Sequence, residues 1–154
     1  MKLTTTTIFG LSLLFFGSVA QATLSPLSVR AESITNQTKQ TIDLLDAGKF
    51  VTSEGQTAPT TGSAIVFTIN GQQFVQLSQD FSTANGPDVE VIIYEHNSVP
   101  VSIEGTGEYV SLGQLNEFEG RQRYAVPDDV DISQFGSIGI WCEQFDVTFG
   151  YLSL

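Results

Sequence analysis

The stretch AIVFTINGQQFVQLS, residues 64–78, decides the fold, because two runs of strand-forming residues flank the pair Asn70-Gly71. A two-residue type I′ turn needs positive φ at both central positions, which Asn and Gly tolerate best. The turn therefore fixes the register of an antiparallel hairpin. The predicted pairs are Ile69 with Gln72, Phe67 with Phe74, Ile65 with Gln76, Val66 with Val75 and Ala64 with Leu77. Both faces are apolar near the middle, so we expect a layered structure that covers at least part of the outer face.

Alternation of this kind continues to the end of the chain in short segments separated by turn residues. We expect further strands at residues 89–94, 109–115, 123–126, 138–142 and 145–152. No helical period of useful length follows residue 48. The sequence therefore predicts an all-β fold, an antiparallel β-sandwich or flattened barrel of roughly eight short strands.

The first 22 residues have the three parts of a signal peptide. Met1-Lys2 gives a positive end, residues 8–17 form an apolar run, and Ala20-Gln21-Ala22 has the small-x-small spacing of a cleavage site. No later segment approaches the roughly 20 apolar residues that a membrane-spanning helix needs. We expect cleavage after Ala22, a mature chain with no membrane span, and a periplasmic or secreted location.

Residues 23–47 are expected to be a linker or spacer, because Ser, Thr and Gln are frequent and apolar anchors are few. The spacing of the apolar residues allows one loose helix over about residues 34–45, with Gly48 as its stop. The folded domain is then expected to run from 48 to 154.

The amino-acid composition limits the partners and the catalytic and metal sites that the chain can have. A net charge of −11 disfavours nucleic acid and anionic membrane surfaces as partners. One cysteine and one histidine exclude a disulfide framework and a zinc site of several thiolates, and no Gly-x-Ser-x-Gly elbow is present. Asp128, Asp129, Asp131 and Ser133 lack the spacing of a calcium loop and are explained by a turn. We expect no metal site and no enzymatic activity.

Six short motifs then carry a family resemblance. They are Gly48-Lys49-Phe50, Thr61-Gly62-Ser63-Ala64, Asp80-Phe81 with Gly86-Pro87-Asp88-Val89, Tyr109-Val110-Ser111-Leu112-Gly113-Gln114-Leu115, Tyr124-Ala125-Val126-Pro127 and Ile140-Trp141-Cys142-Glu143-Gln144-Phe145. In this order and spacing they resemble the electron-transfer DM-thirteen domain over about residues 48–154. The resemblance implies an extracytoplasmic β-sandwich, often associated with DOMON domains, that carries electrons through its single cysteine. In this chain that cysteine is Cys142, as a redox thiol or as a ligand to a prosthetic group such as haem.

The residues themselves leave the role of Cys142 open. Ile138, Ile140 and Cys142 share one strand face, so the thiol faces the core if the isoleucines do. An inert buried cysteine is common, whereas an unpaired thiol is unusual in an oxidising compartment. The alternatives to an inert core cysteine are a redox or ligand role and an intermolecular disulfide.

Other residues of the motifs receive smaller roles. If Cys142 coordinated a haem, His96 would be the candidate second ligand, because it is the only histidine. A solvent-exposed loop histidine is the simpler interpretation. Trp141 is expected on the strand face opposite Cys142, as a core or inter-layer anchor. Gly86, Pro87 and Asp88 form a supporting turn in which Asp88 caps the backbone.

Together these observations predict a secreted or periplasmic electron-transfer accessory module that acts with a redox partner protein through Cys142. The alternative is a non-catalytic envelope or matrix module that binds protein or polysaccharide through an exposed sheet face.

The export prediction has a direct check. N-terminal sequencing of the protein purified from its native source should begin at Thr23, because signal peptidase cleaves after the small-x-small motif. Recovery of intact Met1 in a membrane fraction would contradict it.

Overall fold

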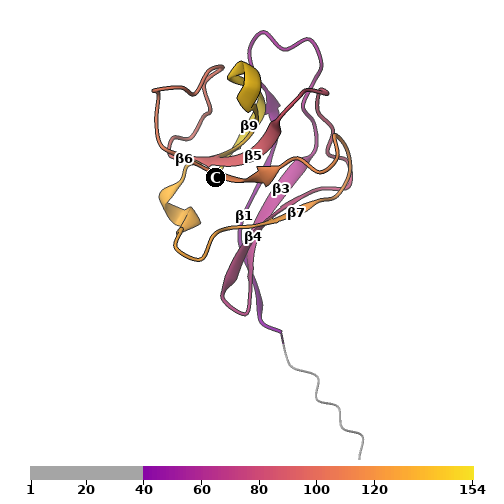
Figure 1. The fold of residues 1–154 in the computed structure, drawn as a ribbon. Coiled ribbons are helices and arrows are strands. Elements are labelled where there is room, and N and C mark those ends of the chain that lie inside the picture. Colours follow the sequence, from indigo (N-terminus) through magenta and orange to yellow (C-terminus); the bar gives the residue numbers. More distant parts are fainter. Residues whose placement is uncertain (1–39) are drawn as a thin grey trace, which may run out of the picture. The chain divides into compact units, whose positions relative to one another are not determined.

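The computed structural model describes residues 40–154, which form two antiparallel sheets packed face to face (Figure 1). The first sheet has the order β1-β3-β4-β7 and the second the order β2-β9-β8-β5-β6. The strands are β1 (Ile42–Lys49), β2 (Val51–Thr52), β3 (Ser63–Ile69), β4 (Gln72–Leu77), β5 (Val89–Tyr94), β6 (Tyr109–Gln114), β7 (Arg123–Ala125), β8 (Ser137–Cys142) and β9 (Val147–Ser153). Two short 3₁₀ turns, η1 (Ile132–Gln134) and η2 (Glu143–Phe145), precede β8 and β9. The all-β sandwich is thus confirmed, without closure into a barrel.

The hairpin of β3 and β4 has the predicted register, from Ala64 opposite Leu77 to Ile69 opposite Gln72. Asn70 and Gly71 take φ values of 51° and 89°, as a type I′ turn requires. On the outer face, the rings of Phe67 and Phe74 stack with centroids 5.7 Å apart, and the Arg123 guanidinium lies over both. The expected cover of the outer face is therefore provided in part by one side chain of β7.

The main core lies between the two sheets. Alternate residues of β3 and β4 point into it from one side, and alternate residues of β5, β8 and β9 from the other. Its fully buried members include Val66, Val75, Val91, Ile138 and Ile140.

A second, smaller core covers the outer face of the second sheet. Ile92, Tyr94 and Trp141 project from β5 and β8, and Val99 and Ile103 cover them from the long loop of residues 95–108. Every residue of β8 is buried as a result.

Two expected boundaries are wrong. Residues 42–45 belong to strand β1, not to a helix, and the sandwich begins before residue 48 because β1 pairs with β3. Pairing at a sheet edge overrides a weak local helical spacing. The last strand begins at Val147 because Asp146 takes a left-handed φ of 46°, which leaves Phe145 exposed in η2. The signal peptide and the rest of the spacer lie outside the described residues.

Candidate functional site

The single cysteine lies in the core between the sheets. The Cys142 side chain is fully buried and clusters with Ile138 and Ile140, which the strand alternation predicted. Its thiol donates a hydrogen bond to the Pro87 carbonyl at 3.0 Å. The sulfur is therefore enclosed by the inner sheet faces and the backbone of the turn that precedes β5.

The turn that holds the Pro87 carbonyl lies at the surface. Pro87 and Asp88 are exposed, while Val89, the next residue, pairs with Cys142 across the β5–β8 ladder. Asp88 takes a φ of 45°, and its carbonyl accepts a hydrogen bond from the Glu143 N–H at 2.9 Å. Asp88 therefore stabilises the turn through its backbone carbonyl and its left-handed φ. We call residues Gly86–Asp88 the thiol turn.

Gly86 is required by the way the thiol turn packs. A Cβ atom at this position would lie 2.9 Å from Cζ of Phe149, closer than Cβ atoms approach in proteins, and 3.1 Å from Cγ2 of Val89, tighter than most Cβ contacts. A larger residue would push the thiol turn away from the body of the domain. The Gly-Pro-Asp sequence therefore closes the core over the sulfur.

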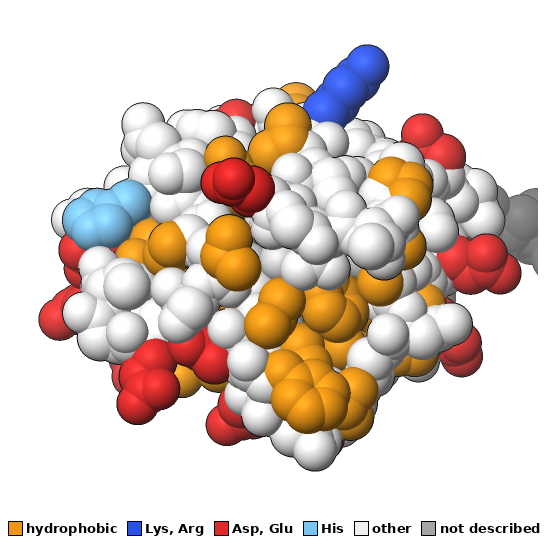
Figure 2. Space-filling view, turned by 90° about the horizontal axis from the view of Figure 1, so that it is seen from above, with side chains coloured by type: hydrophobic (Ala, Val, Ile, Leu, Met, Phe, Trp, Pro, Cys, Tyr) orange, Lys and Arg blue, Asp and Glu red, His pale blue; other side chains and the backbone are white. Residues whose placement is uncertain are grey.

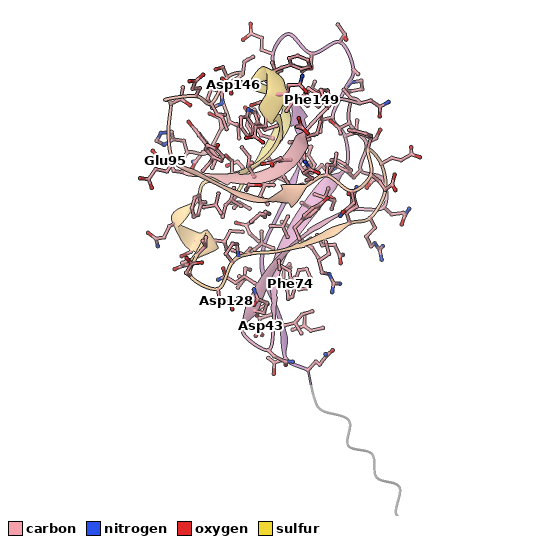
Figure 3. The ribbon with its side chains drawn as sticks, in the orientation of Figure 1. Asp43, Phe74, Glu95, Asp128, Asp146 and Phe149 are labelled. Atoms are coloured by element: carbon pink, nitrogen blue, oxygen red, sulfur yellow. The ribbon has the colours of Figure 1, made fainter. Side chains whose placement is uncertain are left out.

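His96 lies far from this site. It follows β5 by two residues, and its side chain is 59% exposed with Nε2 2.9 Å from a carboxylate oxygen of Glu95 (Figure 3 labels Glu95). Tyr94 pairs with Ser137 at one end of the β5–β8 ladder and Val89 with Cys142 at the other. At about 3.3 Å per residue the ladder separates them by about 17 Å, so the structure does not bring His96 and Cys142 together.

The residues around Cys142 do not fit a haem group. The sulfur points into packed core and its hydrogen bond goes to a backbone carbonyl. Cys142 lines none of the five principal surface hollows of residues 40–154. A macrocycle needs an open slot beside its axial ligand, and the folded domain provides none here.

The aspartates after β7 form a turn. The Asp131 carboxylate accepts a hydrogen bond from the Ser133 N–H at 3.0 Å and caps η1. Hydrogen bonds from the Ser133 side chain and backbone lower the pKa of Asp131 below its ordinary value. In the part of the chain that the structure describes, no group of three or more His, Cys, Asp or Glu side chains is placed to hold a metal ion.

Trp141 lies on the opposite face of β8 from Cys142, and its environment is organised by Asp146. The Asp146 carboxylate accepts hydrogen bonds from the Trp141 Nε1–H at 3.0 Å, the Ile103 N–H at 3.0 Å, the Glu104 N–H at 3.4 Å and the Ser102 hydroxyl. These bonds join η2, β8 and the loop of residues 95–108 at one carboxylate. Figure 3 shows Asp146 at the end of the domain that also holds Phe149, opposite Asp43 and Asp128.

This arrangement was not predicted from the sequence. Apart from Trp141, the partners of Asp146 lie more than 40 residues earlier, in a loop without a periodic pattern. The positive φ of Asp146 turns its side chain back toward that loop. Asp-Val after a Glu-Gln-Phe turn carries no signal specific enough to predict such contacts.

A two-sheet antiparallel sandwich with one enclosed thiol is the class of protein that the fold and site define. The model of the family described as Electron transfer DM13 matches residues 49–154, and the chain therefore belongs to this family. No curated protein and no solved structure matches the chain. Across residues 40–154, no helix combines the length and the hydrophobicity needed to cross a membrane.

The enclosure of Cys142 predicts how it reacts with a thiol reagent. Labelling should be slow in the native state and fast in denaturant, because the folded domain covers the sulfur. Gly86→Ala should speed native labelling on the order of tenfold, the equivalent of about 1.4 kcal/mol of easier opening. Asn85→Ala, an exposed change in the same loop, is the matched control. Equal rates for the wild type and Gly86→Ala would show that the thiol turn does not control access.

The carboxylate of Asp146 predicts a pH dependence at Trp141, the only tryptophan of the chain. Burial raises the pKa of Asp146, but the hydrogen bonds from Ser102, Ile103, Trp141 and Glu104 outweigh it and leave the pKa below its ordinary value. A lowered pKa in the folded state means that the ionised carboxylate stabilises the fold above the unfolded pKa, about 3.9, and that this stability is lost as the pH falls through the lower, folded pKa.

Trp141 fluorescence should therefore change at a pH below the ordinary range of an aspartate, as the loop of residues 95–108 loosens. In Asp146→Asn this transition should be missing, and the free energy of unfolding should be lower at neutral pH. An unchanged acid titration in Asp146→Asn would contradict the assignment.

Proposed function

We propose that the chain is an extracytoplasmic electron-transfer accessory module in which Cys142 is the redox group. The observation that carries the proposal is the position of Cys142 in a member of an electron-transfer family: one thiol, enclosed in the core and hydrogen-bonded to the carbonyl of Pro87 in the thiol turn. Methionine occurs only at position 1, so Cys142 is the sulfur that the sandwich domain offers. The module is proposed to work with a partner protein and not as an enzyme.

The chemistry that suits a single thiol is thiol–disulfide exchange. Once the thiol turn opens, the Cys142 thiolate attacks one sulfur of a partner disulfide. The partner's S–S bond breaks, a mixed disulfide with Cys142 forms, and the released partner thiolate takes up the proton that Cys142 has lost. A dithiol of a second protein then attacks the Cys142 sulfur with one of its thiols, which breaks the mixed disulfide and releases the first partner with both of its sulfurs reduced. The other thiol of the second protein attacks the new mixed disulfide, restores Cys142 and leaves the second protein with a disulfide, so that two electrons pass from its dithiol to the first partner.

The closed turn supports control of this reaction by opening. Two hydrogen bonds hold the thiol turn, from the Cys142 thiol to the Pro87 carbonyl and from the Glu143 N–H to the Asp88 carbonyl. Local openings of loops cost less free energy than unfolding of the whole domain. A thiol protected in this way resists oxidation by small molecules in an oxidising compartment and reacts when a partner favours the open turn.

The extracytoplasmic location is part of the proposal. It is supported by the signal-peptide pattern of residues 1–22, and the expected mature N-terminus at Thr23 tests it separately from the chemistry. A binding function is a second candidate, favoured by the aromatic hollow on the other face of β8.

Replacing the sulfur tests the redox role. Cys142→Ser keeps a hydroxyl that donates to the Pro87 carbonyl, so the β-sheet circular dichroism should be unchanged and the loss of stability should be about 1 kcal/mol. The wild type should form a mixed disulfide with oxidised glutathione, seen by intact mass, and Gly86→Ala should form it faster. Cys142→Ser should form none and should show no redox response in voltammetry.

A Cys142→Ser variant that matches the wild type in redox assays, or a wild type that forms no mixed disulfide even when Gly86→Ala opens the turn, would overturn the proposal. Cys142 would then be a core residue, and a binding function would be the better assignment.

A further inference from the structure

We propose that the hollow over Trp141 binds the cationic end of a lysine or arginine side chain of a partner protein. The hollow has a volume of about 320 Å³ and is lined by Ile103, Glu104, Gly105, Gly107, Tyr109, Trp141, Glu143 and Asp146. It lies on the outer face of the second sheet, whereas Cys142 lies on the inner face. The inference therefore does not depend on the redox role of the thiol.

Two aromatic rings form one wall of the hollow. The centroids of Tyr109 and Trp141 lie 5.3 Å apart with an interplanar angle of 59°. Tyr109 is 42% exposed, which is unusual for a large ring in the middle of a hollow, while Trp141 is buried beside it. The exposed ring of Tyr109 therefore offers an electron-rich face to a cation held within about 6 Å of its centroid, with Trp141 packed behind it.

Two carboxylates give the hollow its charge. Glu104 and Glu143 are exposed, and within residues 40–154 neither forms an ion pair with Lys or Arg. Arg123, on the outer face of the first sheet, is held by Gln76 and the rings of Phe67 and Phe74. The negative charge at the hollow is thus left for a ligand to balance.

The charge of the whole chain favours the same kind of ligand. On the face that Figure 2 shows, acidic side chains occur at several places and hydrophobic side chains gather in one area. With 17 acidic and 6 basic residues in the chain, a basic partner is also attracted at long range.

The hollow is held in shape before any ligand arrives. The Asp146 carboxylate fixes the indole of Trp141 and the backbone of residues 103 and 104. The Tyr94 hydroxyl shares a hydrogen bond of 2.9 Å with Thr106, and a Cβ at Gly107 would lie 2.6 Å from that hydroxyl. Since the walls are already ordered, binding costs little conformational entropy.

The charge selects a cation over a neutral sugar. Both ligands stack on aromatic rings, and sugar hydroxyls can donate hydrogen bonds to the carboxylates, but a neutral sugar leaves their negative charge unbalanced. A protonated amine or guanidinium pairs with the carboxylates and covers the rings at the same time.

Trp141 reports binding directly because it is the only tryptophan. Titration of the full-length mature protein with a tetralysine peptide should change its fluorescence in a saturable way. The same peptide with all lysine amines acetylated and blocked at its N-terminus should give no change. Raising the salt concentration from 0.05 to 0.5 M, about the range over which exposed charges become screened, should weaken binding.

Variants separate a local site from general attraction to an acidic protein. By calorimetry, Glu104→Gln with Glu143→Gln should weaken tetralysine binding about fivefold, and Tyr109→Leu about threefold. Glu117→Gln with Glu119→Gln is the matched control, because it removes the same charge from exposed positions beyond the other end of β6. This control should change the affinity less than twofold at the higher salt concentration. Circular dichroism should show that all the variants keep the sheet.

Three results would overturn the inference. They are an unchanged Trp141 signal with tetralysine, equal weakening by the two double variants, and equal binding of the acetylated peptide or of a neutral oligosaccharide. None of these results affects the mixed-disulfide assay of Cys142, so the two proposals fail separately.

Discussion

Strand β8 is the constraint on which the rest of the domain depends, because both of its faces have to be covered. All six of its residues are buried. Ile138, Ile140 and Cys142 face the other sheet, while Trp141 is covered by a loop and not by a sheet. A central strand that is apolar on both sides is stable only inside three layers of chain. The loop of residues 95–108 is the third layer, and Asp146 attaches it.

This requirement explains why the two candidate sites are neighbours in sequence and separate in space. Consecutive side chains of a strand point to opposite faces, so Cys142 and Trp141 lie on opposite sides of the second sheet. The covers differ in kind as well. The thiol is enclosed by another sheet and a tight Gly-Pro-Asp turn, whereas the indole is covered by a long loop that a carboxylate holds. The first cover protects a reactive atom, and the second leaves a hollow.

The sequence predicted the parts of this arrangement that follow from local chemistry. Asn70-Gly71 fixed the hairpin register, and alternation placed Cys142 with Ile138 and Ile140. Strand β1 was missed because none of its apolar residues is buried: Ile42, Leu44 and Leu45 are all exposed, so no two-residue period marks the strand. It forms because β3 offers an unpaired edge, which is a property of the folded sheet and not of residues 42–49. The fixing of the loop by Asp146 was missed for the same reason, since its partners meet only after the sheets pack.

Charge also distinguishes the two faces of the second sheet, the one with Cys142 and the one with Trp141. An acidic domain is repelled by acidic surfaces, so a partner that approaches closely has to bring positive charge. The Trp141 hollow offers unpaired carboxylates beside exposed aromatic area, while the thiol turn offers backbone and one aspartate, Asp88. The Glu143 N–H binds the Asp88 carbonyl, and the Glu143 side chain lines the hollow. The short η2 segment therefore touches both sites, and a cation held at Glu143 lies one residue from the thiol in the chain.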